Sequence, residues 1–479
     1  MDKVTSFYNK PYAFLNKREE PPKRKVEERI GDFREFEQFL SPEQLHLQVS
    51  RCMDCGIPYC HALGCPLRNR IPDFNSMVYS GHWERALEIL HSTNNFPEIT
   101  GRVCPAPCEK ACTLEISGEP VIIRHIELQI AEWGWREGYV RPQINPNKTH
   151  KKVAIIGSGP SGLSCAQELA RMGHTPVVFE RQDRIGGLLR YGIPDFKLEK
   201  WILDRRIEQL KQEGVEFETE VDVGVDISAR YLRRHFHAIF IAMGAGVPRD
   251  LDIPGRTLSG IHFALDYLTQ QNRQVAGEAI PKEKQIHAFG KHVVVIGGGD
   301  TGSDCVGTAR RQGAKTITQI EILPKPPLHR PLDNPWPTWP NVLRSSSSHE
   351  EGCERLWSVT PKAFLGQEGR VTGIQCVQVK WIEANGKKMC TEVPHSEFEL
   401  PADLVLISAG FLHVEHGSLI RDLQLPIDAR GNIVVNENGR TPILGIFAGG
   451  DAVQGPSLVV KAIAEGRKVA RGIHQYLFQ

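Results

Sequence analysis

The sequence predicts an α/β protein in which a mostly helical, cysteine-rich domain precedes two parallel-sheet domains of similar design. Beyond residue 152, strand-like apolar runs alternate with helix-like stretches, which is typical of parallel sheets covered by helices. A strand followed by a glycine-rich turn and a helix occurs twice, with starts about 140 residues apart. Seven of the 12 cysteines lie between Cys52 and Cys112, before the first of these turns.

Composition narrows the classes of function. A chain of 479 residues, 40% hydrophobic and 24% charged, is long enough for two or three globular domains. Lys and Arg number 58 and Asp and Glu 57, so no excess charge favours a nucleic acid or an anionic membrane surface. The N-terminus has no apolar signal core, and no stretch offers about 18 consecutive apolar residues for a membrane span. We therefore expect a cytoplasmic protein that binds neither nucleic acid nor membrane.

The N-terminal third has two kinds of sequence. Residues 1 to about 40 mix both charge signs, which favours an exposed arm over a packed element. From Ser41 onward cysteines alternate with helical signals: Ser41 is an N-cap followed by proline, and residues 83–90 have helical apolar spacing. The polar segment 141–152 contains two prolines and predicts a linker. We therefore place the helical domain at residues 1–150.

The first glycine-rich turn, GSGPSG at 157–162, lies between a strand-like run and a helical stretch. In dinucleotide-binding Rossmann domains, such glycines make the turn, let the backbone approach a pyrophosphate and pack the helix on the strand. The helix N-terminus then offers unpaired N–H groups to the phosphates. Glu180 lies 23 residues after Gly157, where a carboxylate accepts hydrogen bonds from ribose hydroxyls. The predicted nucleotide contacts are Gly157, Gly159, Pro160, Gly162 and Glu180; the alternative is a glycine turn without ligand.

The second glycine-rich turn, GGGDTG at 297–302, has the same context and predicts a second nucleotide site. Glu321 lies at the corresponding strand end, where an acid favours a free 2′-hydroxyl and repels a 2′-phosphate. This favours NADH over NADPH, although Lys325 could accept a phosphate and Glu321 could be a loop residue without ligand. The predicted contacts are Gly297, Gly299, Asp300, Thr301, Gly302 and Glu321.

Two further segments, 180–194 and 445–452, resemble the flavin-contacting elements of two-dinucleotide-binding flavoproteins. The resemblance implies that FAD binds the first unit and that the NAD(P)H domain is inserted into the FAD domain. It places the FAD domain at 151–250 and 411–479 and the NAD(P)H domain at 251–410. A disulfide reductase is disfavoured because no redox CxxC follows the first glycine-rich helix. The further FAD contacts that it implies are Gly187, Leu188, Gly450, Asp451 and Ser457.

The clustered cysteines have the spacings CxxCx4Cx4CP and Cx3Cx3C. Thiolates at this density suit zinc or iron–sulfur clusters, and a tight run that ends in Cys-Pro is typical of ferredoxin-type ligation. A neighbouring flavin favours iron–sulfur clusters, because one-electron centres give the electrons of a hydride an exit. The predicted cysteine ligands are Cys52, Cys55, Cys60, Cys65, Cys104, Cys108 and Cys112.

Two four-iron clusters need eight ligands, and the clustered cysteines supply seven. One cluster is therefore incomplete, or a residue other than cysteine binds iron. Glu127, in a stretch of helical character, is the preferred candidate, and the competitors are Glu115, Glu119 and His125. The remaining cysteines are expected to be small buried hydrophobic residues: Cys165, Cys305, Cys353, Cys376 and Cys390.

Motifs along nearly the whole chain, among them RCMDCGIPYCH, NNFPEITGRVCPAPCEKAC, GGGDTGSDCVGTARRQGA and NPWPTWP, resemble the small (beta) subunits of glutamate synthases. The N-terminal region and the flavin modules are also similar to those of dihydropyrimidine dehydrogenase. The gap between Cys60 and Cys65 is one residue longer than is frequent in related sequences, which bears on how the ligands pair. The resemblance implies two [4Fe-4S] clusters with interleaved ligands, one on Cys52, Cys55, Cys60 and Cys112 and the other on Cys65, Cys104, Cys108 and Glu127.

The same resemblance implies an electron-input subunit of glutamate synthase. Such a subunit oxidises NADH or NADPH through FAD and passes electrons through its clusters to a large (alpha) subunit, which makes glutamate from glutamine and 2-oxoglutarate. Two alternatives stay open: a related subunit of a ferredoxin:NAD(P) oxidoreductase or sulfide dehydrogenase, and a non-catalytic zinc scaffold. No general acid or base is expected from the chain, because the flavin carries the hydride chemistry.

Overall fold

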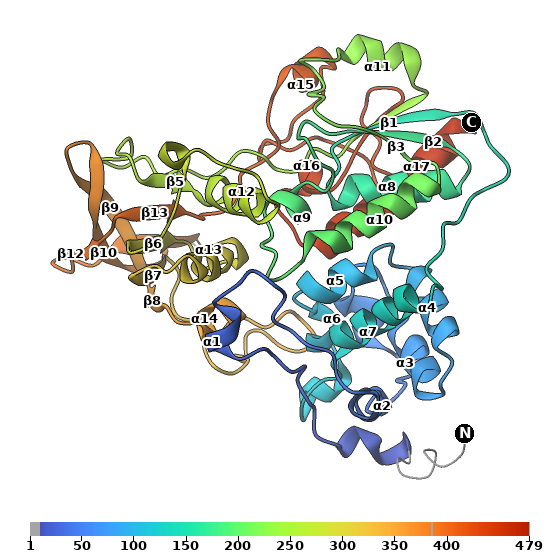
Figure 1. The fold of residues 1–479 in the computed structure, drawn as a ribbon, viewed down its shortest axis with the longest axis horizontal. Coiled ribbons are helices and arrows are strands. Elements are labelled where there is room, and N and C mark those ends of the chain that lie inside the picture. The colour runs from blue at the N-terminus through green and yellow to red at the C-terminus, as the bar shows by residue number, and fades with distance from the viewer. Residues whose placement is uncertain (1–9, 385–386, 479) are drawn as a thin grey trace.

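The computed structural model describes residues 10–384 and 387–478, and three parts can be followed in Figure 1. A helical part, in blue and cyan, precedes two parallel sheets with helices packed on them. The predicted α/β class with a helical N-terminal domain is confirmed. The helices of this N-terminal domain are α2 (Pro42–Ser50), α3 (Ile71–Tyr79), α4 (Trp83–His91), α5 (Pro97–Val103), α6 (Pro107–Lys110) and α7 (Ile123–Arg136).

Helix α2 begins where the sequence predicts. The side chain of Ser41 accepts a hydrogen bond from the backbone N–H of Gln44 at 3.2 Å, and the backbone N–H of Ser41 donates to Gln44 Oε1 at 2.9 Å. This reciprocal capping box satisfies two N–H groups that have no partner inside the helix. Helix α4 covers the segment 83–90 with its apolar face inward, so that Leu87 and Leu90 join the core.

The first sheet has the strand order β14-β4-β1-β2-β3, and every pair is parallel. Strand β14 joins β4 although more than 200 residues separate them in the chain. The polypeptide therefore leaves this sheet after β4 and returns to complete it. The strands are β1 (Lys152–Ile156), β2 (Thr175–Phe179), β3 (Glu216–Glu218), β4 (Ala238–Ile241) and β14 (Ile446–Ala448).

The second sheet lies in the inserted segment and has the parallel order β5-β13-β6-β7-β8. The insertion of one sheet domain into the other is thereby confirmed, while the residue limits of the three domains stay predictions. The strands are β5 (Ile261–Phe263), β6 (His292–Ile296), β7 (Thr316–Glu321), β8 (Glu354–Trp357) and β13 (Leu404–Ile407).

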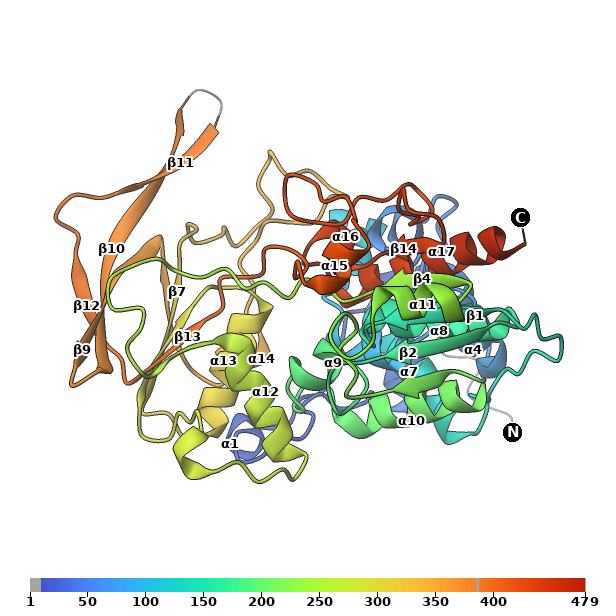
Figure 2. The same cartoon turned by 90° about the horizontal axis from the view of Figure 1, so that it is seen from above.

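Four strands of the inserted segment form a separate antiparallel sheet, which the sequence analysis did not predict. Figure 2 shows the β10–β11 hairpin extending away from the rest of the molecule. The strands are β9 (Val359–Gln367), β10 (Arg370–Ala384), β11 (Lys387–Glu392) and β12 (Phe398–Pro401). Within the described ranges, no helix is both long and apolar enough to cross a membrane.

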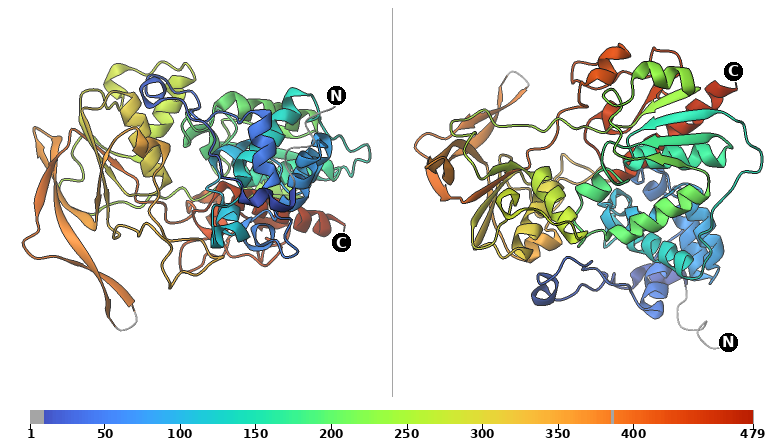
Figure 3. Two further views of the ribbon diagram at one scale, coloured as in Figure 1. Left: turned by 90° about the horizontal axis from the view of Figure 1, so that it is seen from below. Right: turned by 45° about the horizontal axis from the view of Figure 1, so that its top comes forward.

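The expected exposed arm is only partly right for the described residues 10–40, because most of them are exposed or half-buried but a few, among them Arg29, are buried against other parts of the chain. Figures 1 and 3 show this segment running from the helical domain to the second sheet domain, where α1 (Val26–Arg29) lies beside α14 (Ser347–Glu350). Arg29 is 1% exposed, and its Nε lies 2.8 Å from Glu351 Oε1. The buried carboxylate that compensates this guanidinium is more than 300 residues away in the chain, so local charge patterning does not reveal the contact.

The expectation for the scattered cysteines is partly wrong. Cys165, Cys305 and Cys376 are buried, as predicted, but Cys353 is half-buried and Cys390 is exposed. Cys390 lies on β11, which pairs with only one strand and leaves the body of the domain, so its side chain has no core to enter.

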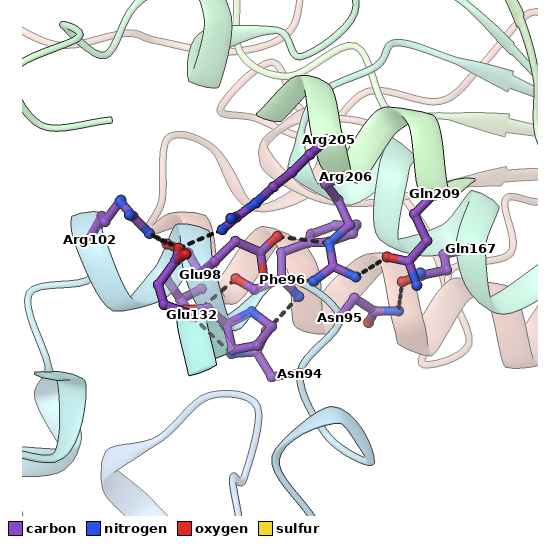
Figure 4. A network of polar contacts seen from close by, with 12 residues as sticks. Asn94, Asn95, Phe96, Glu98, Arg102, Glu132, Gln167, Arg205, Arg206 and Gln209 are labelled. Carbon is purple, nitrogen blue, oxygen red and sulfur yellow. Dashed lines mark hydrogen bonds and ion pairs between the residues drawn. The ribbon is translucent and has the colours of Figure 1, made fainter. Parts of the chain in front are cut away.

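A buried polar joint connects the helical domain to the first sheet domain (Figure 4). Arg206 on α10 (Lys200–Gln212) donates to both carboxylate oxygens of Glu98 on α5 at 2.7 Å. Nearby, Asn95 Nδ2 donates to Gln167 Oε1 on α8 (Pro160–Arg171) at 2.8 Å. Because these groups are buried and paired, they define how the two domains sit on each other.

Candidate functional site

The first glycine-rich turn connects β1 to α8. Gly157 has φ of 103°, and a Cβ there would lie 2.5 Å from the carbonyl oxygen of Ala242. A Cβ on Gly162 would collide with the carbonyl oxygen of Gly157, because the helix starts directly over the strand. Both positions therefore require glycine, and the backbone N–H groups at the start of α8 stay accessible to a phosphate.

A cavity of about 430 Å³ opens above this turn, a size typical of a site for a small organic ligand or cofactor. Gly162 packs beneath the turn, and Gly450 lies against Ser161 at the entrance to α16 (Asp451–Gln454), so these two predicted contacts do not line the cavity. The predicted FAD contacts that do line it are Gly157, Gly159, Pro160, Glu180, Gly187, Leu188, Asp451 and Ser457.

The carboxylates at this cavity are held by hydrogen bonds. Glu180 Oε2 accepts from the hydroxyl of Ser158 at 2.5 Å, and its Oε1 accepts from the backbone N–H of Gln182 at 2.9 Å. Asp451 accepts from the hydroxyl of Ser457 at 2.6 Å, and burial raises the pKa of Asp451. A carboxylate oriented in this way is prepared to accept hydrogen bonds from a ligand without reorganisation.

The second glycine-rich turn repeats this arrangement between β6 and α13 (Asp300–Arg311). Glu321, at the end of β7, accepts from the backbone N–H of Gly298 at 2.7 Å and from that of Leu323 at 2.9 Å. Glu180 is held by the equivalent residues, Ser158 and Gln182, so the repeat in sequence is also a repeat in structure. The structure places the predicted nucleotide contacts Gly297, Gly299, Asp300, Thr301, Gly302 and Glu321 at this turn.

The seven clustered cysteines divide between two small pockets of the helical domain. The first pocket is lined by Cys52, Cys55, Cys60 and Cys112. The second is lined by Cys65, Cys104, Cys108 and Glu127. Each pocket thus has four potential ligands drawn from both runs of the sequence, and thiolate donors in such a set fit iron–sulfur ligation.

Burial raises the pKa of the Cys65 and Cys104 thiols to about 12, and for Cys104 this outweighs the opposing charge of Arg124. Metal binding would compensate the charge of the thiolates. Among the described residues, no group of three or more His, Cys, Asp or Glu side chains has the arrangement of a single-ion site.

Glu127 is the acidic residue that reaches the second pocket. It lies on α7, burial raises its pKa to about 7, and Asn69 Nδ2 donates to its Oε1 at 2.9 Å. The competing candidates lie elsewhere: Glu115 pairs with Lys110 at 3.1 Å, and His125 Nδ1 contacts Glu37 Oε1 at 2.9 Å. Neither these two nor Glu119 lines the second pocket.

The cavity above the first glycine-rich turn, called the flavin-type cavity below, and the second cysteine pocket meet at the start of α17 (Val459–Leu477). Val459 lines the cavity, and the next residue, Val460, lines the second pocket. Two consecutive residues of one helix therefore line the cavity and the thiol-containing pocket. The first pocket is nearer the surface, since three of its four cysteines are half-buried, whereas only Cys104 of the three cysteines at the second pocket is.

Comparison with known proteins agrees with this division. Residues 151–466 match the family described as pyridine nucleotide-disulphide oxidoreductase, and residues 29–139 match dihydropyrimidine dehydrogenase domain II, 4Fe-4S cluster. The chain is 49% identical to the glutamate synthase [NADPH] small chain of Mycobacterium tuberculosis, over 98% of this chain and 96% of that protein. This chain belongs to the glutamate synthase small-chain family.

Two further relatives and one solved structure are similar to this chain. The glutamate synthase [NADPH] small chain of Bacillus subtilis is 44% identical over 98% of both chains. The glutamate synthase [NADH] of Schizosaccharomyces pombe is also 44% identical, over 93% of this chain but only 22% of that protein. FprA of M. tuberculosis in complex with NADPH shares the fold, with a TM-score of 0.55, 20% identity, and coverage of 69% of this chain and 85% of that chain.

Membership of the glutamate synthase small-chain family makes the chain an NAD(P)H-dependent flavoprotein oxidoreductase with a 4Fe-4S domain. Several residues around the site were not predicted from the sequence. Ser158 holds Glu180, and its place inside the glycine-rich turn was the available signal. Arg181 and Glu415 form an ion pair at 2.8 Å, and both line the cavity, but they are 234 residues apart and no local pattern connects them.

Proposed function

We propose that this chain is the electron-input subunit of a glutamate synthase and works in the cytoplasm. The observation that carries the proposal is the adjacency of Val459 and Val460, which line the flavin-type cavity and the second cysteine pocket. In the proposal, electrons enter at the flavin-type cavity, pass to the neighbouring second cysteine pocket, and then reach the first cysteine pocket near the surface. When bound, FAD accepts hydride from NAD(P)H, and iron–sulfur clusters carry the electrons onward singly.

The residues of the chain bind and orient these groups. In the proposal, the N-terminus of α8 and its glycines hold the pyrophosphate of FAD, and Glu180 accepts hydrogen bonds from its ribose. The N-terminus of α13 and Glu321 do the same for the nicotinamide dinucleotide. The two pockets hold one [4Fe-4S] cluster each, and Glu127 completes the second ligand set. The donor chemistry and the four-and-four division of the side chains support this assignment.

The cofactor content of the purified chain tests this assignment. Anaerobically purified protein is expected to contain one FAD and about eight non-haem irons with matching labile sulfide, because two four-iron clusters fit the two pockets. Flavin absorbance, iron assay and sulfide assay measure the three quantities. Iron near four per chain would reject the second cluster, and stoichiometric zinc without sulfide would reject the electron-transfer role altogether.

The proposed partner is a large glutamate synthase subunit that forms glutamate from glutamine and 2-oxoglutarate. Two relatives are named as small chains, and the single-chain S. pombe enzyme carries the matching region as 22% of its length. A large remainder therefore exists in that protein beside the part that this chain resembles. Co-purification with the large subunit from the native host tests the pairing, and capture of a ferredoxin- or sulfide-linked partner instead would favour the alternative.

We also propose that Glu321 favours NADH. Its carboxylate is held at the turn by two backbone N–H groups and would lie near the 2′-position of a bound adenosine, where it repels a 2′-phosphate. The bacterial relatives are named for NADPH and the fungal one for NADH, so names do not decide the preference.

Nucleotide preference gives the corresponding test. The Glu321→Gln variant is expected to raise kcat/KM for NADPH relative to NADH by about fivefold, which corresponds to about 1 kcal/mol of charge repulsion removed. Initial rates with both nucleotides and an artificial acceptor measure the ratio. Lys325→Gln is the matched control, since it removes the nearby cation instead of the acid. A wild-type preference for NADPH would show that the assignment of Glu321 is wrong.

A further inference from the structure

One buried side-chain amide at the first cysteine pocket makes no hydrogen bond within the described chain. Asn75 lies on α3 and lines this pocket together with Cys52, Cys55, Cys60 and Cys112. Ile71 and Pro72, which lie four and three residues earlier, line the same pocket, so this face of the helix forms part of the pocket wall.

Asn75 is 1% exposed, and neither Nδ2 nor Oδ1 has a hydrogen-bond partner among the described residues. A buried amide normally finds partners, because leaving its donors and acceptor unpaired costs the hydration that it had in the unfolded chain. An amide that is orphaned on both atoms and lines a pocket therefore indicates a group that occupies the pocket.

The second pocket provides a contrast. Asn69 and Asn94 line it, and both are satisfied by the protein: Asn69 donates to Glu127 at 2.9 Å, and Asn94 donates to the hydroxyl of Thr100 at 2.9 Å. Two asparagines at the deep pocket thus have protein partners, whereas the asparagine at the outer pocket has none in the described chain. The difference singles out Asn75.

We propose that the Asn75 amide donates a hydrogen bond to a sulfur atom of the iron–sulfur cluster held in the first pocket and thereby raises the reduction potential of that cluster. This inference rests on the proposed function. Apart from Asn75 and the four cysteines, the lining of the pocket is mainly apolar, so sulfur is the acceptor that the chemistry of the site offers to an N–H donor.

The direction of the effect follows from charge. One-electron reduction, with the electron supplied by the flavin, adds one negative charge to the cluster and its thiolates. A hydrogen bond to sulfur is stronger in the more negative state and therefore stabilises the reduced form, which raises the potential. The outer cluster would then be a better electron acceptor than the same cluster without this hydrogen bond, which favours electron flow toward the surface.

Redox titration of the holoprotein, followed by electron paramagnetic resonance, tests the inference. In Asn75→Leu, which has a similar volume and no donor, the reduced-to-oxidised ratio of one cluster at a fixed potential is expected to fall about tenfold, equal to about 59 mV for one electron. The other cluster should keep its midpoint. Ile71→Val is the matched control, because it changes the packing of the same wall without removing a donor, and its midpoints should stay within a third of that shift.

Iron and sulfide assays on every sample separate the possible failures. A wild-type chain without a cluster at the first pocket would overturn the proposed function itself, whereas an intact cluster with the same midpoint in wild type and Asn75→Leu would overturn only the role of Asn75. If Asn75→Leu loses the cluster, the hydrogen bond is tested instead in wild-type protein labelled with ¹⁵N at asparagine. Magnetic coupling between an amide nitrogen and the reduced cluster is expected, and its absence would refute the hydrogen bond.

Discussion

The isolated chain is expected to oxidise NAD(P)H with an artificial electron acceptor and to form no glutamate from glutamine and 2-oxoglutarate. The described residues form two dinucleotide-type sheet domains, a small antiparallel sheet and a helical domain. An eightfold β/α barrel typically needs about 250 residues, and the described part of the chain contains none. We expect the reactions of glutamine and of 2-oxoglutarate to take place on the proposed large subunit.

Separate assays of NAD(P)H oxidation and glutamate formation measure the two activities. Adding the large subunit should make glutamate formation depend on NAD(P)H. A Cys108→Ser change, which removes a donor of the second pocket, should lower that coupled rate at least about 100-fold while flavin reduction by NAD(P)H continues. Cys390→Ser, at an exposed cysteine on β11, is the control and should keep the coupled rate. Glutamate production by the pure isolated chain would contradict the assignment as an electron-input subunit.

The second large effect is expected at the joint in Figure 4. The side chains of Arg206 and Glu98 are 1% and 0% exposed, and they pair at 2.7 Å. Removing one partner leaves an uncompensated buried charge, which typically costs about 3–5 kcal/mol. Glu98→Ala should therefore lower the free energy of unfolding by about that amount, or abolish the folded domain joint entirely.

Urea denaturation followed by the tryptophan signal measures this loss, since Trp135 lies under the Arg206 guanidinium at 4.9 Å. The control is Glu88→Ala, which breaks an exposed pair with Arg85 at 2.6 Å and should cost about 1 kcal/mol or less. The same joint holds α5 of the helical domain against α10 of the first sheet domain, so Glu98→Ala should also slow electron transfer from flavin to clusters. A loss for Glu98→Ala no larger than for Glu88→Ala would refute the buried-pair argument.

Much of the candidate site could be predicted because its signals are local in the chain. The conformations needed at Gly157 and Gly162, the N-cap at Ser41 and the strand-end positions of Glu180 and Glu321 each depend on a few neighbouring residues. Apolar runs are likewise local, and they identified five strands within a few residues, namely β1, β2, β4, β6 and β13. The four strands of the antiparallel sheet were not predicted. Two of them, β11 and β12, have no fully buried face that would produce an apolar pattern.

The sequence by itself determined the two glycine-rich turns and the presence of a thiol-rich domain, because spacing and local backbone geometry encode these features. The insertion of one domain in the other was implied by the family resemblance and not by any local pattern. Spacing alone did not decide which cysteines meet; the family resemblance implied the two groups, and the tertiary structure brings the same groups together. Cys112 lies with Cys52, Cys55 and Cys60, and Glu127 rather than Glu119 lines the second pocket. The ion pair of Arg29 with Glu351 is seen only in the tertiary structure. The physical reason is that burial and pairing depend on how whole elements pack. Whether a charge is compensated, or an amide such as Asn75 is left without a partner, therefore depends on neighbours that are distant in the chain.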